Sequence, residues 1–258
     1  MSLDHAITFA PTFVLVFFRM AGLMVMSPLF GSAKVPRRMK VLFASVAALG
    51  GMSAIKEPVA FPDSLAGLTI GIGGEIMFGL AMGLIVSFTF IAAQWAGEMI
   101  GQQIGFNLSE VFDPQYGQGG TLIGDLYFML TLVIFLAIDG HRLMLIAVYD
   151  SLQTAPLLSL TFTQSFFDSI LDLFTASTVL ALRLAAPMFF TMLVVDLAMG
   201  CIGRAMPQFN VMTAGLTIRA VLGIGVLLVG VTISSDALTA SLESQIDFVG
   251  ETWRNYGK

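Results

Sequence analysis

Long apolar runs constrain this chain more than any other feature. The run from Pro11 to Phe30 has about the twenty residues that a helix needs to cross a hydrocarbon core, and Arg19 is its one charge. The run from Leu65 to Ala93 is longer and contains only Glu75 as a charged residue. Charged residues make up 11% of the chain, far below the quarter or so of a soluble protein, so lipid or apolar protein must cover much of its surface. These runs predict an all-α integral membrane protein, because a helix satisfies its backbone hydrogen bonds without water.

Six apolar segments emerge from the rest of the pattern, and not all of them fit a simple crossing. They cover residues 11–30, 41–55, 65–93, 126–148, 174–202 and 211–234. The fourth is interrupted by Asp139 to Arg142, which predicts a hairpin turn at partial depth, tolerated only where protein or water surrounds it.

The positions of the basic residues indicate which loops are cytoplasmic, and they conflict with a simple serpentine path through the membrane. Lys34, Arg37, Arg38 and Lys40 hold four of the twelve basic residues, so their loop is expected to be cytoplasmic. A serpentine path would also place residues 97–124 in the cytoplasm, yet these contain no lysine or arginine. We therefore expect helical hairpins of which some do not span the bilayer conventionally, within a single membrane domain over residues 1–258. The polar tail from 235 to 258 is expected to form a surface helix.

Several kinds of chemistry lack their residues. One cysteine and two histidines provide no disulfide framework or Cys/His metal site, and no nucleotide or nucleophile motif occurs in its required context. With a net charge of −5, the chain as a whole lacks the polybasic character that would suggest nucleic acid or an anionic lipid surface as its partner. We therefore predict a protein that is not an enzyme and has no cofactor and no metal.

Charged residues inside the apolar runs are the candidate functional side chains. Arg19, Glu75, Arg183 and Asp196 lie where an unpaired charge is costly. Arg183 and Asp196 are thirteen positions apart, roughly 20 Å along a helix, so each must pair with another helix or subunit. A proton or ion relay is one interpretation. Pairs that fix assembly geometry are the favoured one, because clustered carboxylates are missing.

Two further features concern packing and a loop. Gly79 and Gly83, and likewise Gly97, Gly101 and Gly105, recur at every fourth residue, which predicts close helix approach. Residues 106–120 break every period and expose the apolar side chains Phe106, Leu108, Val111 and Phe112 next to Asp113 and Pro114. The loop is either an ordinary connector or a segment whose rings close a pore by excluding water.

Short strings across most of the chain resemble the FliR family in order and spacing. They are Phe18 to Gly31, Val35-Pro36, Glu75 to Gly83, Gly101 to Gly105, Phe112 to Pro114 and Pro207 to Val211. The resemblance implies a subunit of the flagellar type III export gate in the bacterial inner membrane. It further implies a helical ring with FliP and FliQ, contacts with FlhB and FlhA, and a position of much of the complex on the periplasmic side of the flagellar basal body. Unfolded flagellar proteins would pass through its pore.

The resemblance also implies roles for residues. Residues 106–120 match the family's pore plug, with Phe112 as the preferred closing ring. Arg19, Glu75, Gln102, Gln208 and Asn210 match polar positions that would hold subunits in register. Two other functions stay open: a subunit of the related injectisome, and a secondary transporter for a small solute, which embedded charges support but a missing internal repeat does not.

Overall fold

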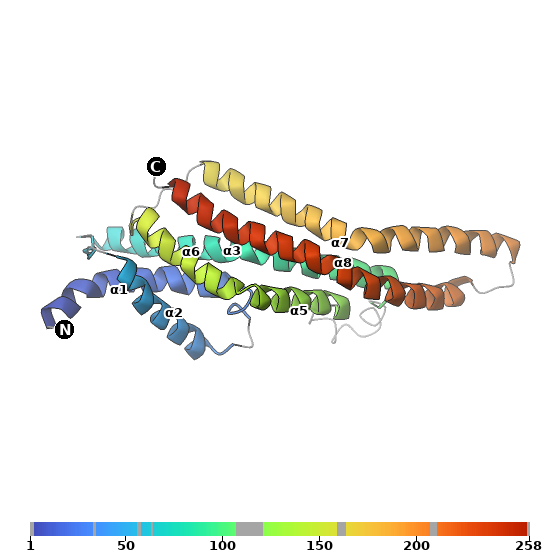
Figure 1. Cartoon of the computed structure of the whole chain (residues 1–258), viewed down its shortest axis with the longest axis horizontal. Helices are drawn as coiled ribbons and strands as arrows, with labels where there is room; N and C mark the ends of the chain where they lie inside the picture. Colours follow the sequence, from blue (N-terminus) through green and yellow to red (C-terminus); the bar gives the residue numbers. More distant parts are fainter. Residues whose placement is uncertain are drawn as a thin grey trace. The chain divides into compact units, whose positions relative to one another are not determined.

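The computed structural model describes residues 3–32, 35–55, 58–62, 64–106, 121–158, 164–206 and 211–256, and all regular structure in them is helical (Figure 1). The helices are α1 (Leu3–Met26), α2 (Arg37–Gly51), the short 3-10 helix η1 (Met52–Ala54), α3 (Leu65–Ile104), α5 (Leu122–Ala137), α6 (Gly140–Thr154), α7 (Gln164–Ala205) and α8 (Val211–Tyr256). The predicted all-α class is confirmed.

Four helices are long and apolar enough to cross a membrane. The candidate spans are Phe9–Met26, Leu65–Ile104, Phe167–Ala205 and Ala214–Phe248, and α5 with α6 makes a fifth if this bent pair is one span. The predicted second segment becomes α2, which has only 15 residues. The predicted polar tail continues α8 without a break, since α8 runs for 46 residues.

The break between α5 and α6 is a bend of 65°, smaller than the reversal of the predicted hairpin turn. Asp139 takes a left-handed conformation with φ 55°, which stops the first helix. Helical bonding resumes at once, because the N–H groups of Arg142 and Leu143 donate to the Asp139 carbonyl at 2.9 and 3.1 Å. One left-handed residue therefore deflects the chain between two helices that follow each other almost directly.

The chain forms two compact units. The first unit comprises residues 1–88, 135–173 and 242–258, and the second comprises residues 89–134 and 174–241. Because α3, α7 and α8 are long, each contributes one part to each unit.

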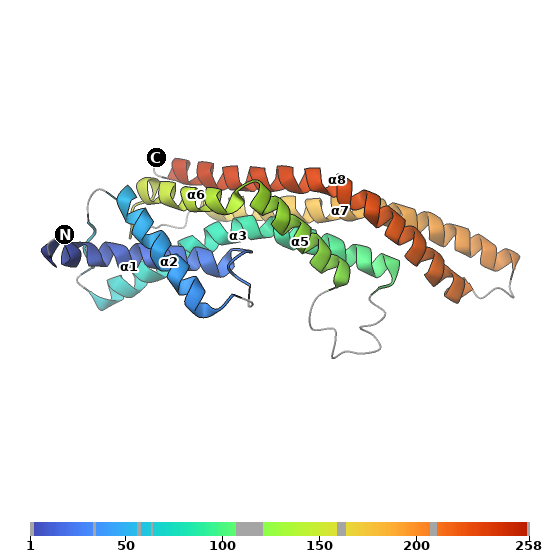
Figure 2. The same ribbon diagram turned by 60° about the horizontal axis from the view of Figure 1, so that its bottom comes forward.

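In the first unit, α1 packs on α3 through glycine, and α2 lies against α1 (Figure 2). A Cβ added at Gly79 would collide with the Arg19 carbonyl oxygen, and one added at Gly22 would collide with the Ile76 carbonyl oxygen. Gly83 faces the Leu23 carbonyl oxygen, at 2.9 Å from an ideal Cβ. The two backbones are therefore in direct contact, as small residues permit in membrane helices.

The core of the second unit combines small and large side chains. Ala92, Ala93 and Ala96 on α3 are buried in one cluster with residues of α5, α7 and α8. Gly97 lies against the backbone of Ile123 and Gly124 at the start of α5, 2.5 Å from an ideal Cβ to the Ile123 carbonyl oxygen. Large residues fill the remaining space: Ile100, Ile104, Tyr127, Leu184, Met188, Met192 and Leu238.

Candidate functional site

A buried ion pair joins α1 to α3 in the first unit. Arg19 Nε donates to Glu75 Oε2 at 2.6 Å, and both side chains are 0% exposed. The residues are 56 positions apart in sequence and meet where Gly79 brings the two helices together. The guanidinium carbon lies 4.3 Å from the centroid of the Phe78 ring, a geometry that favours a cation.

The remaining donors of Arg19 are used by the end of α6. Nη1 donates to the Ser151 hydroxyl at 3.3 Å and carbonyl at 3.4 Å, and Nη1 and Nη2 donate to the Ala155 carbonyl at 3.2 and 3.3 Å. The Ser151 carbonyl also accepts the Ala155 N–H at 2.8 Å, and carbonyls at the C-terminal end of a helix carry partial negative charge that attracts a cation. Arg19 thus caps α6 as well as pairing with Glu75.

Glu75 in turn holds the segment after α6. Its Oε1 accepts a hydrogen bond from the Leu158 backbone N–H at 3.0 Å. Leu158 has φ 66°, a left-handed conformation that is rare for a leucine and is held here by this bond. The two charges therefore connect α1, α3, α6 and residues 155–158 into one network, which we name the Arg19 network.

A second ion pair links α7 to α8 in the second unit. Arg219 Nη2 donates to Asp196 Oδ1, and the two side chains are 41% and 45% exposed. The sequence predicts that Asp196 pairs with another helix or another subunit, and in this structure Asp196 lies on α7 and Arg219 on α8. Arg219 was overlooked, although it lies inside the apolar run 211–234 and the rule that selected Arg183 would have found it.

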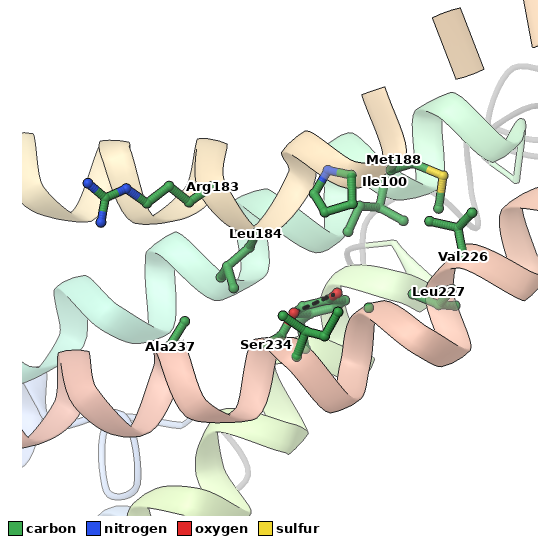
Figure 3. Close-up of a pocket in the computed structure, with 12 residues that line it drawn as sticks. Ile100, Arg183, Leu184, Met188, Val226, Leu227, Ser234 and Ala237 are labelled. Atoms are coloured by element: carbon green, nitrogen blue, oxygen red, sulfur yellow. Dashed lines mark hydrogen bonds between the residues drawn. The ribbon is translucent and has the colours of Figure 1, made fainter. Parts of the chain in front are cut away.

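Arg183 is one of the residues that line an apolar cavity of about 80 Å³ in the second unit (Figure 3). Its guanidinium group points away from Ser234, whose hydroxyl is hydrogen-bonded to Tyr127 at 3.3 Å. Pro187, which lines the same cavity, lies four residues after Arg183 and removes the helical donor for its carbonyl. The cavity therefore lies beside a proline in α7.

The predicted plug loop begins where α3 ends. Gly105 has φ 92°, and the Phe106 N–H donates to the Gly101 carbonyl while the Gly105 N–H donates to the Gln102 carbonyl. This is the Schellman pattern, so Gly105 terminates the helix. Phe106 is 39% exposed, and Gln102 is exposed on α3. The other predicted residues, Leu108, Val111, Phe112, Asp113, Pro114, Gln208 and Asn210, lie outside the described residues.

The described part of the chain contains no cluster of three or more histidine, cysteine, aspartate or glutamate residues that could hold a metal ion. What the site offers chemically is charge pairing and close helix contact. The Arg19 network contains both in one place.

Comparison with known proteins identifies the family of this chain. A family model described as "Bacterial export proteins, family 1" matches residues 10–244. The flagellar biosynthetic protein FliR of Bacillus subtilis (strain 168) is 31% identical over 231 residues, which is 88% of each chain. Proteins of the same name are similar in Aquifex aeolicus (25% identical, 85% of each chain) and in Escherichia coli K12 (26% identical, 81% of this chain and 80% of that one).

The match extends over the Arg19 network, the pair of Asp196 and Arg219, and Phe106 at the start of the predicted plug loop, and it agrees with the membrane-type helices. This chain therefore belongs to the FliR family, and it is a membrane protein of the flagellar export apparatus.

Proposed function

We propose that this chain is a structural and gating subunit of the flagellar export channel, and that it forms a pore in the inner membrane with FliP and FliQ. Unfolded flagellar proteins pass through that pore, while other components of the apparatus provide the energy. In this role the chain is not an enzyme and binds no cofactor. Family membership supports the proposal, and all three relatives above carry a flagellar name.

The observation that carries the proposal is the uncovered surface of α7 and α8. In the most apolar stretch of Ala214–Phe248 only 11% of the residues are buried by the chain itself, whereas in that of Leu65–Ile104 the share is 72%. Large side chains such as Phe190, Leu197 and Val221 are 65–71% exposed. This apolar surface requires a covering of lipid or protein.

The exposed pair of Asp196 and Arg219 favours protein as that covering. Charges that face hydrocarbon are costly, whereas charges in an interface between subunits can gain further hydrogen bonds. Neighbouring helices from FliP and FliQ would cover the apolar side chains and complete the partners of these two charges. The same argument gives Arg183 a place at a subunit contact.

The gate is assigned to residues 106–120. The Schellman end of α3 releases the chain at Gly105 and leaves Phe106 exposed at the start of this segment. Phe106, Leu108, Val111 and Phe112 would close the pore by apolar contact and separate when a polypeptide passes.

Native mass spectrometry of the membrane complex tests the assembly. We expect this chain together with several FliP and FliQ subunits. A stable, functional chain without companions, with a melting temperature raised by a small solute, would overturn the proposal and revive the transporter.

Membrane conductance tests the gate. Shortening residues 106–120, or Phe112→Ala, is expected to leave the complex assembled but permeable to ions. Unchanged conductance in both variants, with normal assembly, would show that these residues do not close the pore. Loss of motility with intact effector secretion after deletion of the gene would separate the flagellar function from the injectisome.

A further inference from the structure

The α2 helix has its small residues inside and its large apolar residues outside. Its buried residues are Ala44, Ala47, Ala48 and Gly51. The Tyr149 hydroxyl donates to the Ala47 carbonyl at 3.1 Å, which holds this face against α6. With 15 residues, α2 is about 22 Å long and too short to cross a hydrocarbon core of about 30 Å.

The outer face of α2 is apolar and uncovered. Its large side chains are between 42% and 61% exposed: Met39, Val41, Leu42, Phe43, Val46 and Leu49. Ser45, the polar side chain among them, donates its hydroxyl to the Val41 carbonyl of its own helix at 2.8 Å. The face therefore offers broad apolar contact and little means of directional hydrogen bonding to a protein partner.

Positive charge gathers at one end of this face. Arg37 and Arg38 are exposed in the first turn, and the helix sequence contains no acidic residue. Neither arginine forms an ion pair with a residue that the structure describes. Lys40 is engaged separately, since its Nζ donates to the Gly31 carbonyl at 3.1 Å. Cations in the first turn oppose the helix dipole, so the stability of the helix does not account for them.

We propose that α2 lies in the membrane interface, with its outer face among the acyl chains near the headgroups and with Arg37 and Arg38 on the phosphates of anionic phospholipids. Short length, a broad apolar face and basic residues at one end are the features of an interfacial helix. The charge complementarity to an anionic leaflet is direct, because juxtamembrane arginines are attracted to its surface potential. This lipid contact is independent of the proposed pore, and it anchors the first unit through α1.

Depth-dependent quenching tests the proposal on the full chain in its native complex. In a Cys201→Ser background, Val46→Cys carries an environment-sensitive fluorophore, and the complex is reconstituted in phosphatidylcholine discs with or without phosphatidylglycerol. Quenchers sit on the lipid acyl chains either near the headgroup or near the terminal methyl. We expect stronger quenching by the shallow quencher, and a further increase when phosphatidylglycerol is present.

The arginines provide the specific control. The double substitution Arg37→Gln with Arg38→Gln should lower quenching in the anionic discs. Each arginine strengthens binding to the anionic surface by about fivefold, so the decrease should be at most about fivefold for each arginine removed. The same variants should have no effect in phosphatidylcholine alone, and Arg37→Lys with Arg38→Lys should preserve the quenching. Arg142→Gln, which changes an exposed arginine in the first turn of α6, should leave it unchanged.

Three results would overturn the proposal. Stronger quenching by the deep quencher would place the outer face of α2 in the bilayer core and not at the interface. Quenching that changes neither with phosphatidylglycerol nor with substitution of both arginines would show that anionic lipid does not bind this helix. No quenching, together with a crosslink from position 46 to another subunit, would make this face a protein contact. Assembly of the pore with FliP and FliQ would stand under any of these results, so failure here is distinguishable from failure of the proposed function.

Discussion

The two ion pairs of this chain have opposite surroundings. Arg19 and Glu75 in the first unit are wholly buried, and their remaining donors and acceptors are used by Ser151, Ala155 and Leu158. The pair on α7 and α8 in the second unit is nearly half exposed. The chain completes the first pair by itself, whereas the second is left with capacity for further partners. The same chemistry therefore stabilises the fold in one unit and is available for assembly in the other.

Removing Arg19 tests this contrast with the largest expected effect. Arg19→Met leaves the Glu75 carboxylate buried without its cation, which should lower the free energy of unfolding by about 3–5 kcal/mol. Thermal unfolding of the purified complex in detergent measures it. Arg19→Met with Glu75→Met should recover part of the loss, because no unpaired charge remains, although the Ala155 carbonyl and the Leu158 N–H lose these partners. A single variant as stable as the parent protein would show that the network does not hold the first unit together.

Gly79→Ala tests the helix contact on which the buried pair depends, because Gly79 brings α1 and α3 together at Arg19. Its Cβ would collide with the Arg19 carbonyl oxygen, so α1 and α3 must separate, at a cost of about 1–3 kcal/mol. Gly73 is a matched control on the same helix, since no atom lies within 4 Å of an ideal Cβ there. Gly73→Ala should be neutral or stabilising by up to about 1 kcal/mol. Equal effects of the two variants would contradict the close packing.

Tyr127→Phe tests a neutral interaction of the second unit. The Tyr127 hydroxyl is buried with Ser234, and losing their hydrogen bond should cost about 1 kcal/mol in thermal unfolding. Adding Ser234→Ala should cost little more, because no unsatisfied hydroxyl is then left behind. A double variant much less stable than the single one would assign Ser234 another role.

Asp196→Asn should have the smallest effect on stability, about 0–1 kcal/mol, because its ion pair is well exposed. Its effect should appear in assembly, as a several-fold lower yield of complex at normal levels of the chain. Exchanging the charges with Asp196→Arg and Arg219→Asp separates pairing from recognition. Restored yield would mean that assembly requires only an ion pair between α7 and α8. Continued loss would mean that partner subunits recognise which helix carries the negative charge and which the positive charge.

The sequence predicted the candidate site unevenly. It selected Arg19 and Glu75 because a charge in an apolar run needs a partner, but it did not pair them, since nothing local connects positions so far apart. It predicted that Asp196 pairs with another helix or another subunit, without naming Arg219. Gly79 and Gly97 lie at backbone contacts, whereas Gly105 ends α3, and spacing by fours does not separate these uses. The predicted plug residues beyond Phe106 stay a prediction.

Hydropathy by itself determined that the chain is helical and belongs in a membrane, because long apolar runs leave the backbone no other way to satisfy its hydrogen bonds. The succession of short motifs was enough to place it in its family. Only the tertiary structure decided which charge meets which, where the fourth segment bends and which face of α2 stays uncovered. Those outcomes depend on how helices cross, and a crossing is set by contacts between residues that are distant in the sequence.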